Sequence, residues 1–151
     1  MLKALALINI LVSAIVGGMY WGPYLALTKS LKEFELNSFL AIVNRLNKNM
    51  APLMTVLTPL SLLTTIPVLI LSYSNQAAFC FSLMGFLCFV SALFVTIKIE
   101  VPIVKQVITW TESTLPTNWQ ELRDKWGRFH IVRVGCGILG LIFLLVGLFF
   151  M

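Results

Sequence analysis

Four long hydrophobic runs dominate the chain, and stretches rich in polar residues separate the first from the second and the third from the fourth. The runs cover about residues 2–27, 52–73, 77–97 and 129–151. Each can span a bilayer, because a helix of about 20 apolar residues crosses the hydrocarbon core. The pattern therefore predicts an all-α fold, a four-helix transmembrane bundle that forms a single integral membrane domain over residues 1–151.

The polar stretch between the first two spans has a helical pattern of its own. Within residues 28–50, apolar residues recur at steps of 4, 3 and 4, at Phe39, Val43, Leu46 and Met50. This spacing places them on one face of a helix. We therefore expect an additional amphipathic interfacial helix between spans 1 and 2, with Asn47 on one of its other sides, toward headgroups or solvent.

The second polar stretch, residues 98–128, leads into the last span. Pro102 is expected to kink the third helix where it leaves the membrane. Thr117 or Asn118 can cap the next helix, which then continues to Met151.

The composition agrees with a membrane protein. Hydrophobic residues make up 59% of the 151 residues, and charged residues make up 11%. Soluble domains average about 25% charged residues, so this chain lacks the charge that covers a water-facing surface. The formal net charge is +5, but the basic residues lie between the apolar runs. We therefore expect membrane lipids as partners and no nucleic acid.

Lysine and arginine are distributed unevenly over the predicted connections. Residues 28–50 contain four and residues 98–128 contain five, whereas Lys3 stands alone at the N-terminus and the C-terminus has none. The positive-inside rule places both connections in the cytoplasm and both termini outside, and we expect a bacterial inner (plasma) membrane. A signal peptide is the alternative for the first run, but that run is too long and lacks a convincing A-x-A cleavage site.

The chain offers few metal ligands. Its one histidine, His130, belongs to no H-x-x-x-H or E-x-x-H pattern, and three cysteines lie scattered in the apolar runs, at Cys80, Cys88 and Cys136. We predict no metal site and no cofactor, with haem held by His130 as an open alternative. Residues 135–140 match G-x-G-x-x-G, but they lie inside a predicted membrane helix. Close helix contact explains these glycines better than dinucleotide binding does.

The start of the last helix carries the strongest candidate site. At steps of 4, 3, 4, 3 and 4, one face presents Trp119, Arg123, Trp126, His130, Arg133 and Gly137. Histidine titrates near neutrality, so His130 is suited to act as a general base, although an interfacial hydrogen-bonding role explains it too. Arg133 lies inside the apolar run, where a guanidinium needs a buried anion, and Glu100 is the natural candidate. Such a pair can lock two helices together or hold an electrostatic site.

The first span has two faces that favour contact with other helices. One carries mostly polar and aromatic residues, at Asn9, Ser13, Gly17, Tyr20 and Tyr24. The face beside it is a row of small residues, at Ala14, Gly18 and Gly22. Small residues let a neighbouring helix approach, and polar ones form hydrogen bonds between helices. We expect this helix to face protein, through packing alone or as the wall of a pocket.

The segment that opens the last span resembles the anthrone oxygenase-like family of small four-helix membrane proteins. The resemblance is densest over residues 100–140 and rests on Val101-Pro102, Leu115-Pro116, Trp119, Leu122-Arg123, Trp126, His130 and Arg133. Three positions depart from the family pattern. Glu100 and Val104 stand where the family often has the two asparagines of N-V-P-x-N, and Gly127 stands where Asn often separates Trp from Arg.

The resemblance implies an oxygenase that converts an anthrone into an anthraquinone with O₂ and no obvious cofactor. In that chemistry, His130 takes a C–H proton and Arg133 or Arg128 stabilises the enolate, with Glu100 beside them. The candidate substrate-binding residues, which supply flat or polar walls, are Trp119, Trp126, Arg128, Tyr20, Tyr24 and Asn47.

Two other functions stay open at the level of the sequence. The same pocket can bind a lipid, a quinone or haem, or another hydrophobic small molecule, without turnover. Alternatively, the protein can be an interaction or assembly protein whose small-residue faces pack against a partner or form a homo-oligomer.

Overall fold

The structure, a computed structural model, describes residues 1–111 and 113–151. Its elements, in chain order, are α1 (Leu2–Ala26), the 3₁₀-helix η1 (Thr28–Glu33), α2 (Leu36–Ser72), α3 (Gln76–Val95), the π-helical turn η2 (Thr96–Glu100), α4 (Val101–Val107) and α5 (Trp119–Phe149). The part of the chain that is described contains no strand, so the predicted all-α class is confirmed. Residue 112, in the predicted connection 98–128, lies outside the described residues.

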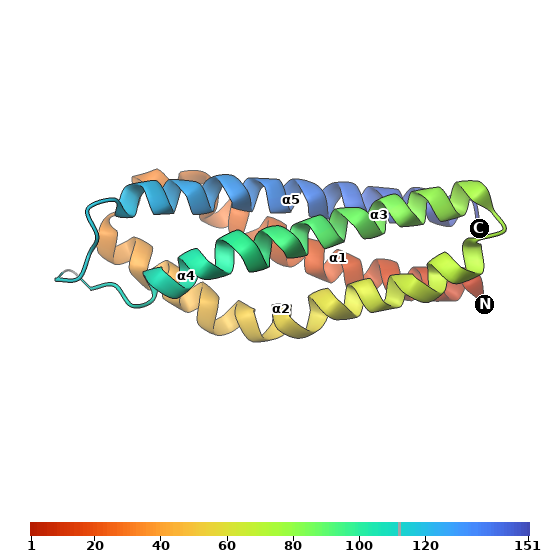
Figure 1. The fold of residues 1–151 in the computed structure, drawn as a ribbon, viewed down its shortest axis with the longest axis horizontal. Helices are drawn as coiled ribbons and strands as arrows, with labels where there is room; N and C mark the ends of the chain where they lie inside the picture. The colour runs from red at the N-terminus through yellow and green to blue at the C-terminus, as the bar shows by residue number, and fades with distance from the viewer. Residues whose placement is uncertain (112) are drawn as a thin grey trace.

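The long helices form a bundle of four. Because α3, η2 and α4 follow one another as one helix over Gln76–Val107, the bundle has four apolar helices long enough to cross a membrane. Contacts join α1 to α2, α2 to α3, α3 to α5 and α5 back to α1. Both termini lie at one end, and η1 and the α4–α5 connection lie at the other (Figure 1). The helices indicate an integral membrane protein; its orientation in the membrane stays a prediction.

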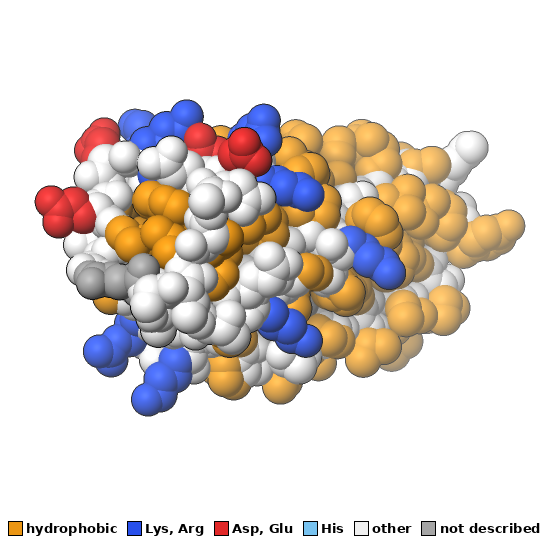
Figure 2. Space-filling view, turned by 60° about the vertical axis from the view of Figure 1, so that its left-hand side comes forward, with side chains coloured by type: hydrophobic (Ala, Val, Ile, Leu, Met, Phe, Trp, Pro, Cys, Tyr) orange, Lys and Arg blue, Asp and Glu red, His pale blue; other side chains and the backbone are white. Residues whose placement is uncertain are grey.

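Charged side chains concentrate at the end of the bundle that carries η1 and the α4–α5 connection. Figure 2 shows lysine, arginine and acidic side chains there, whereas hydrophobic side chains cover the other half of the molecule. Large apolar residues such as Leu11, Ile70 and Phe94 are at least 60% exposed. An outer surface this apolar suits lipid rather than water.

The separate interfacial helix predicted within residues 28–50 is not confirmed. Residues 36–50 form the first turns of α2, which continues without a break through Pro52, Pro59 and Pro67. A proline removes one hydrogen bond of the helical ladder and bends the helix, and neighbouring turns still hold it together. Accordingly α2 remains one helix but bows outward around its middle (Figure 1).

The third helix continues beyond the predicted span, past Pro102. It runs on to Val107 through the π-helical turn η2. In that turn the N–H of Val101 bonds the carbonyl of Thr96, five residues back. The buried positions of this helix therefore step by five, from Val95 to Glu100, where a regular α-helix would step by three or four.

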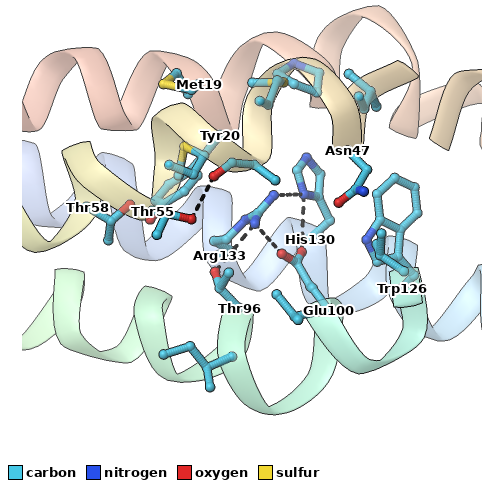
Figure 3. A pocket seen from close by; sticks show the side chains of 18 of the residues that line it. Met19, Tyr20, Asn47, Thr55, Thr58, Thr96, Glu100, Trp126, His130 and Arg133 are labelled. Atoms are coloured by element: carbon cyan, nitrogen blue, oxygen red, sulfur yellow. Dashed lines mark hydrogen bonds and ion pairs between the residues drawn. The ribbon is translucent and has the colours of Figure 1, made fainter. Parts of the chain in front are cut away.

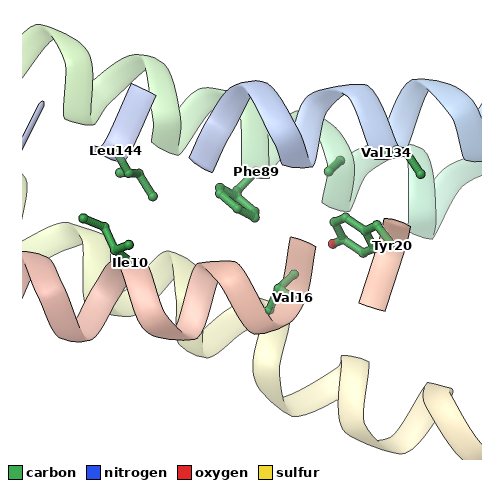
Figure 4. Close-up of a cluster of buried hydrophobic side chains, with 7 residues drawn as sticks. Ile10, Val16, Tyr20, Phe89, Val134 and Leu144 are labelled. Carbon is green, nitrogen blue, oxygen red and sulfur yellow. The ribbon is translucent and has the colours of Figure 1, made fainter. Parts of the chain in front are cut away.

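Glycines bring the helices close together in the half of the bundle near the termini. A Cβ atom on Gly140 would lie 2.9 Å from the Phe89 ring, and one on Gly137 would lie 2.9 Å from the Tyr20 ring. Both rings belong to the buried apolar cluster drawn in Figure 4. Close helix contact is thus confirmed for two glycines of the G-x-G-x-x-G segment, whereas Gly135 faces open space.

A polar seam, made of Asn9 and Ser13 of α1 and Ser61, Thr64 and Thr65 of α2, joins these two helices in the same half. The amide nitrogen of Asn9 donates at 2.9 Å to the carbonyl of Ser61 and to the hydroxyls of Thr64 and Thr65. The hydroxyls of Ser13 and Ser61 lie 2.8 Å apart. The polar face of the first span therefore meets protein, as expected.

Two members of the row of small residues on α1 do not meet another helix among the described residues. Gly18 and Gly22 are exposed, and a Cβ on either would meet nothing within 4 Å, whereas Ala14 is half-buried. The expectation that this row faces protein is wrong for these two glycines within residues 1–111 and 113–151, because α1 turns its polar face toward α2.

Candidate functional site

A cavity of about 530 Å³ lies between the helices in the charged half of the bundle, where α2 bows outward. Most of its lining is apolar and comes from α1, α2, α5 and the continuous α3–η2–α4 helix. Its size falls within the range of about 300–1,000 Å³ that is typical of small-molecule sites. Figure 3 shows a small set of polar side chains that converge on it.

The inner wall of the cavity carries a buried cluster of Glu100, His130 and Arg133. The Nδ1 atom of His130 lies 3.2 Å from Oε1 of Glu100 and 2.7 Å from Nη2 of Arg133. The guanidinium of Arg133 forms an ion pair with Glu100. The side chains of Glu100 and Arg133 are 3% and 14% exposed, so the expected ion pair is largely enclosed. His130, whose side chain is 1% exposed, joins it as a third member.

The local structure explains why these three side chains meet. His130 and Arg133 are three residues apart on α5, so they project from the same face of that helix. Glu100 ends the π-helical turn, which directs its carboxylate toward α5. The hydroxyl of Thr96, from the start of the same turn, accepts a 3.4 Å hydrogen bond from Arg133. A π-helical turn is often found at a functional site, because it displaces side chains from their regular helical positions.

The proton on His130 can occupy either ring nitrogen, and the two contacts of Nδ1 select opposite forms. Arginine can only donate, so the contact with Arg133 requires Nδ1 to accept and leaves the proton on Nε2. The contact with Glu100 requires Nδ1 to donate, which leaves Nε2 as a free acceptor. Nε2 is buried and has no hydrogen-bond partner among the described residues. His130 lines the cavity, so that nitrogen is available to a bound molecule.

Aromatic rings hold the cluster in place. The indole of Trp126 stacks on the His130 ring, with centroids 5.7 Å apart and an interplanar angle of 27°. The Tyr24 ring lies beside the His130 ring, with centroids 6.5 Å apart and an interplanar angle of 39°. The guanidinium of Arg133 rests over the Tyr20 ring at 4.7 Å, a cation–π arrangement that favours the charged arginine.

The structure brings six of the nine predicted site residues to the cavity and leaves three outside it. Those that line the cavity are Glu100, His130, Arg133, Trp126, Tyr20 and Asn47. Tyr24 does not line the cavity, but its ring contacts the ring of His130. Trp119 packs 6.1 Å from the Phe39 ring, nearer the end of the bundle. Arg128 is exposed and lines a separate surface hollow.

Several threonines lie at the site that the sequence analysis did not predict as site residues. Thr96 bonds Arg133, and Thr58 from α2 lines the cavity with a buried hydroxyl. Thr55 also lines the cavity, but its hydroxyl bonds the carbonyl of Ala51 within the same helix. A possible signal was the presence of polar residues in a proline-containing span, since such helices often border cavities in membrane proteins.

Metal ligands are not gathered at the cavity. Among residues 1–111 and 113–151, no group of three or more His, Cys, Asp and Glu side chains is placed to hold a metal ion. The three cysteines, all described, are free thiols.

Comparison with protein families identifies the relatives of this bundle. A family model described as anthrone oxygenase matches residues 39–143, which include most of the cavity and the whole Glu100–His130–Arg133 cluster. No curated protein and no solved structure matches the chain. Because the family model covers well over half of the sequence, the chain belongs to the anthrone oxygenase family, as its resemblance predicted.

Proposed function

We propose that this protein is a membrane-embedded oxygenase that oxidises a hydrophobic aromatic ketone of the anthrone type with O₂, without a cofactor. One observation carries the proposal: the buried His130 lines an apolar cavity, with Glu100 against Nδ1 and no partner on Nε2. A histidine oriented by a carboxylate on one nitrogen and open on the other is suited to general base catalysis. Membership of the anthrone oxygenase family supports an oxygenase-like activity.

The first step is a proton transfer. The reactive tautomer carries its proton on Nδ1, where it donates to Glu100, and Arg133 then binds Glu100 and not the imidazole. Nε2 of His130 removes a proton from the CH₂ group of the substrate, and Glu100 stabilises the imidazolium. The electron pair left on carbon forms an enolate with the ring ketone. The enolate reduces O₂ and bonds to it, the peroxide takes the proton back from the imidazolium, and the resulting hydroperoxide loses water. One oxygen atom becomes the new carbonyl and the other leaves as water, so CH₂ and O₂ give C=O and H₂O.

Arg133 supplies the positive charge that favours the enolate. Its guanidinium lines the cavity next to His130 and is held there by Glu100 and the Tyr20 ring. A fixed charge in an apolar site stabilises a developing anion more strongly than it would in water. We assign this role to Arg133 and not to Arg128, since Arg128 is exposed and outside the cavity.

The substrate reaches the cavity from the bilayer. Exposed residues of α2, such as Ala51 and Thr55, and of the α3–η2–α4 helix, such as Ile97 and Val101, all line the cavity. They mark an opening between these two helices on the apolar outer surface. Trp126 and Asn47 then provide one flat and one polar wall. We propose that the basic connections face the cytoplasm, which places the cavity near that surface.

The test is O₂ consumption by the purified protein in lipid nanodiscs with an anthrone such as dithranol, together with absorbance of the quinone product. We expect His130→Gln to lower the rate by about 10²- to 10⁴-fold, the usual contribution of a general base. Arg133→Gln should also lower it, whereas the matched change Arg45→Gln, at an exposed position on α2, should not.

Other outcomes would support the alternative functions. A Soret band in the purified protein would make His130 a haem ligand and contradict a cofactor-free reaction. A lipid or quinone that co-purifies and blocks the cavity, with no O₂ uptake, would indicate a binding protein. Equal rates for wild type and His130→Gln would remove the histidine from the mechanism.

A further inference from the structure

The cavity has a second polar end, distinct from the Glu100–His130–Arg133 cluster. Arg133 separates the two ends in Figure 3: Thr58 and Tyr20 lie on one side of it, and His130 lies on the other. Thr58 comes from α2 and Tyr20 from α1, and both line the cavity. Their side chains are almost fully buried, with exposed fractions of 3% for Thr58 and 1% for Tyr20.

Both hydroxyls lack a hydrogen-bond partner among the described residues. They are neighbours, close enough to interact, but no hydrogen bond of ordinary geometry joins them. Buried hydroxyls in proteins are nearly always paired, because an unpaired one loses its hydrogen bonds to water. Thr65, the other buried threonine of α2, follows that rule, because its hydroxyl donates to the carbonyl of Ser61.

The Tyr20 side chain is also held rigidly. Gly137 leaves just enough space for its ring, and Arg133 covers one of its faces at 4.7 Å. Its hydroxyl therefore cannot turn away to find a partner elsewhere. A rigid donor that faces a cavity is preorganised for an acceptor that arrives with a ligand.

We propose that the hydroxyls of Tyr20 and Thr58 bind an oxygen atom of the ligand, either a ring ketone or a phenol. The identity of the ring system rests on the proposed function, but the oxygen site rests on the two unpaired hydroxyls. The ligand class is an aromatic ring system with an oxygen substituent at the end remote from His130. Tyr20 and Thr58 are thus specificity-determining residues, which fix the ring so that its CH₂ group faces the histidine.

The experiment compares equilibrium binding of two ligands in nanodiscs without O₂, so that no turnover occurs. Anthrone carries the ketone oxygen, and 9,10-dihydroanthracene has a closely similar ring system without it. We expect Tyr20→Phe and Thr58→Val each to weaken binding of anthrone by roughly 3- to 10-fold, the effect of one neutral hydrogen bond. Binding of dihydroanthracene should stay the same, because these substitutions remove only the hydroxyls.

Two matched variants serve as controls. Thr109→Val makes the same chemical change outside the cavity lining, at an exposed hydroxyl that already bonds the carbonyl of Gln106. Tyr73→Phe removes a tyrosine hydroxyl at a position that is 77% exposed. Neither should alter the ratio of the two affinities. Thermal unfolding of each variant checks that the fold is retained, and Thr58→Val alone decides the question if Tyr20→Phe does not fold.

The outcomes distinguish this inference from the proposed function. If the variants lose the same amount of affinity for both ligands, or lose affinity for neither, the oxygen site is overturned. Wild-type protein that binds the two ligands equally would overturn it as well. The expected binding pattern without O₂ consumption in air would uphold the oxygen site and refute the oxygenase alone. Absence of binding by either ligand would refute both.

Discussion

The two halves of the bundle differ in how most of their buried polar side chains are paired. Near the termini, the Asn9 amide has three hydrogen-bond partners on α2, and glycines hold the neighbouring helices in close contact. In the charged half, Nε2 of His130 and the hydroxyls of Tyr20 and Thr58 are buried without partners around a cavity. The first arrangement stabilises the helix packing, whereas the second leaves polar atoms ready for a ligand.

This contrast separates polar residues that stabilise from those that serve a site. An unsatisfied polar group in an apolar environment lowers stability, so its presence needs an explanation other than packing. Among the described residues, the half near the termini has one such atom, Oγ of Ser82 beside Gly147, whereas the charged half has several and they lie around the cavity. Mutations made separately in each half therefore test the distinction directly.

The largest effect is expected for Glu100→Leu. This change leaves the guanidinium of Arg133 buried without its carboxylate, and breaking a buried ion pair costs about 3–5 kcal/mol. Unfolding in mixed detergent and SDS micelles would measure the free energy of unfolding. The double variant Glu100→Leu/Arg133→Leu should recover most of the loss, because it removes both charges. A double variant as unstable as the single one would mean that the pair itself stabilises the bundle.

A smaller loss is expected where the packed half has no space. Gly140→Ala places a Cβ 2.9 Å from Phe89, whose ring is 1% exposed and cannot move aside. Such overpacking costs about 1–3 kcal/mol. The matched change Gly135→Ala meets nothing within 4 Å and should keep or raise the free energy of unfolding, measured in the same micelles. Equal effects at the two positions would show that contact with Phe89 is not the cause.

The polar seam should be less sensitive than the site cluster. Asn9→Leu removes three interhelical hydrogen bonds, but Thr64 and Thr65 still donate to carbonyls of their own helix. Hydrogen bonds between membrane helices average about 0.6 kcal/mol, so we expect a loss of about 1–2 kcal/mol. The control Asn44→Leu removes only a bond to the carbonyl of Leu40. A loss for Asn9→Leu as large as that for Glu100→Leu would end the distinction between the two halves.

The smallest effect is expected for Ser13→Ala. It removes one hydrogen bond, to the hydroxyl of Ser61, and should lower the free energy of unfolding by about 0.6 kcal/mol. The O₂ uptake assay should show no change in rate, because the seam lies outside the cavity lining. A fall in rate without a fall in stability would link the seam to the site.

The sequence predicted those features that depend on hydrophobic length and on charge balance. Four runs of spanning length predicted the four apolar helices, and the isolation of Arg133 in an apolar run predicted an ion pair with Glu100. The spacing of the last helix placed His130 beside Arg133. These inferences succeed because a membrane leaves few ways to satisfy a buried charge.

Other features escaped prediction because they depend on backbone detail. No periodicity in the sequence predicts the π-helical turn that directs Glu100. The prolines of α2 also gave no sign that residues 36–50 and the second span form one continuous helix. Arg128 and Trp119 looked suited to the site by residue type. The structure places both outside the cavity: Arg128 lies on the exposed side of α5, and Trp119 shares the face of His130 but lies about two turns beyond Trp126, beside Phe39.

The π-helical turn has a consequence for how the two halves tolerate insertions and deletions. Each residue of an α-helix advances the chain by about 100° around the axis, and the turn shifts the inward positions of the third helix from a step of three or four to one of five between Val95 and Glu100. Val95, at the end of α3, and Glu100 in the site therefore share an inward direction only because of the turn, since five residues of a regular α-helix would advance by about 500° and point them about 140° apart. Loss of a single residue within the turn would let it close as a regular α-helical turn with the two halves still in phase, whereas loss of one residue between Phe89 and Val95 would rotate one half relative to the other by about 100°.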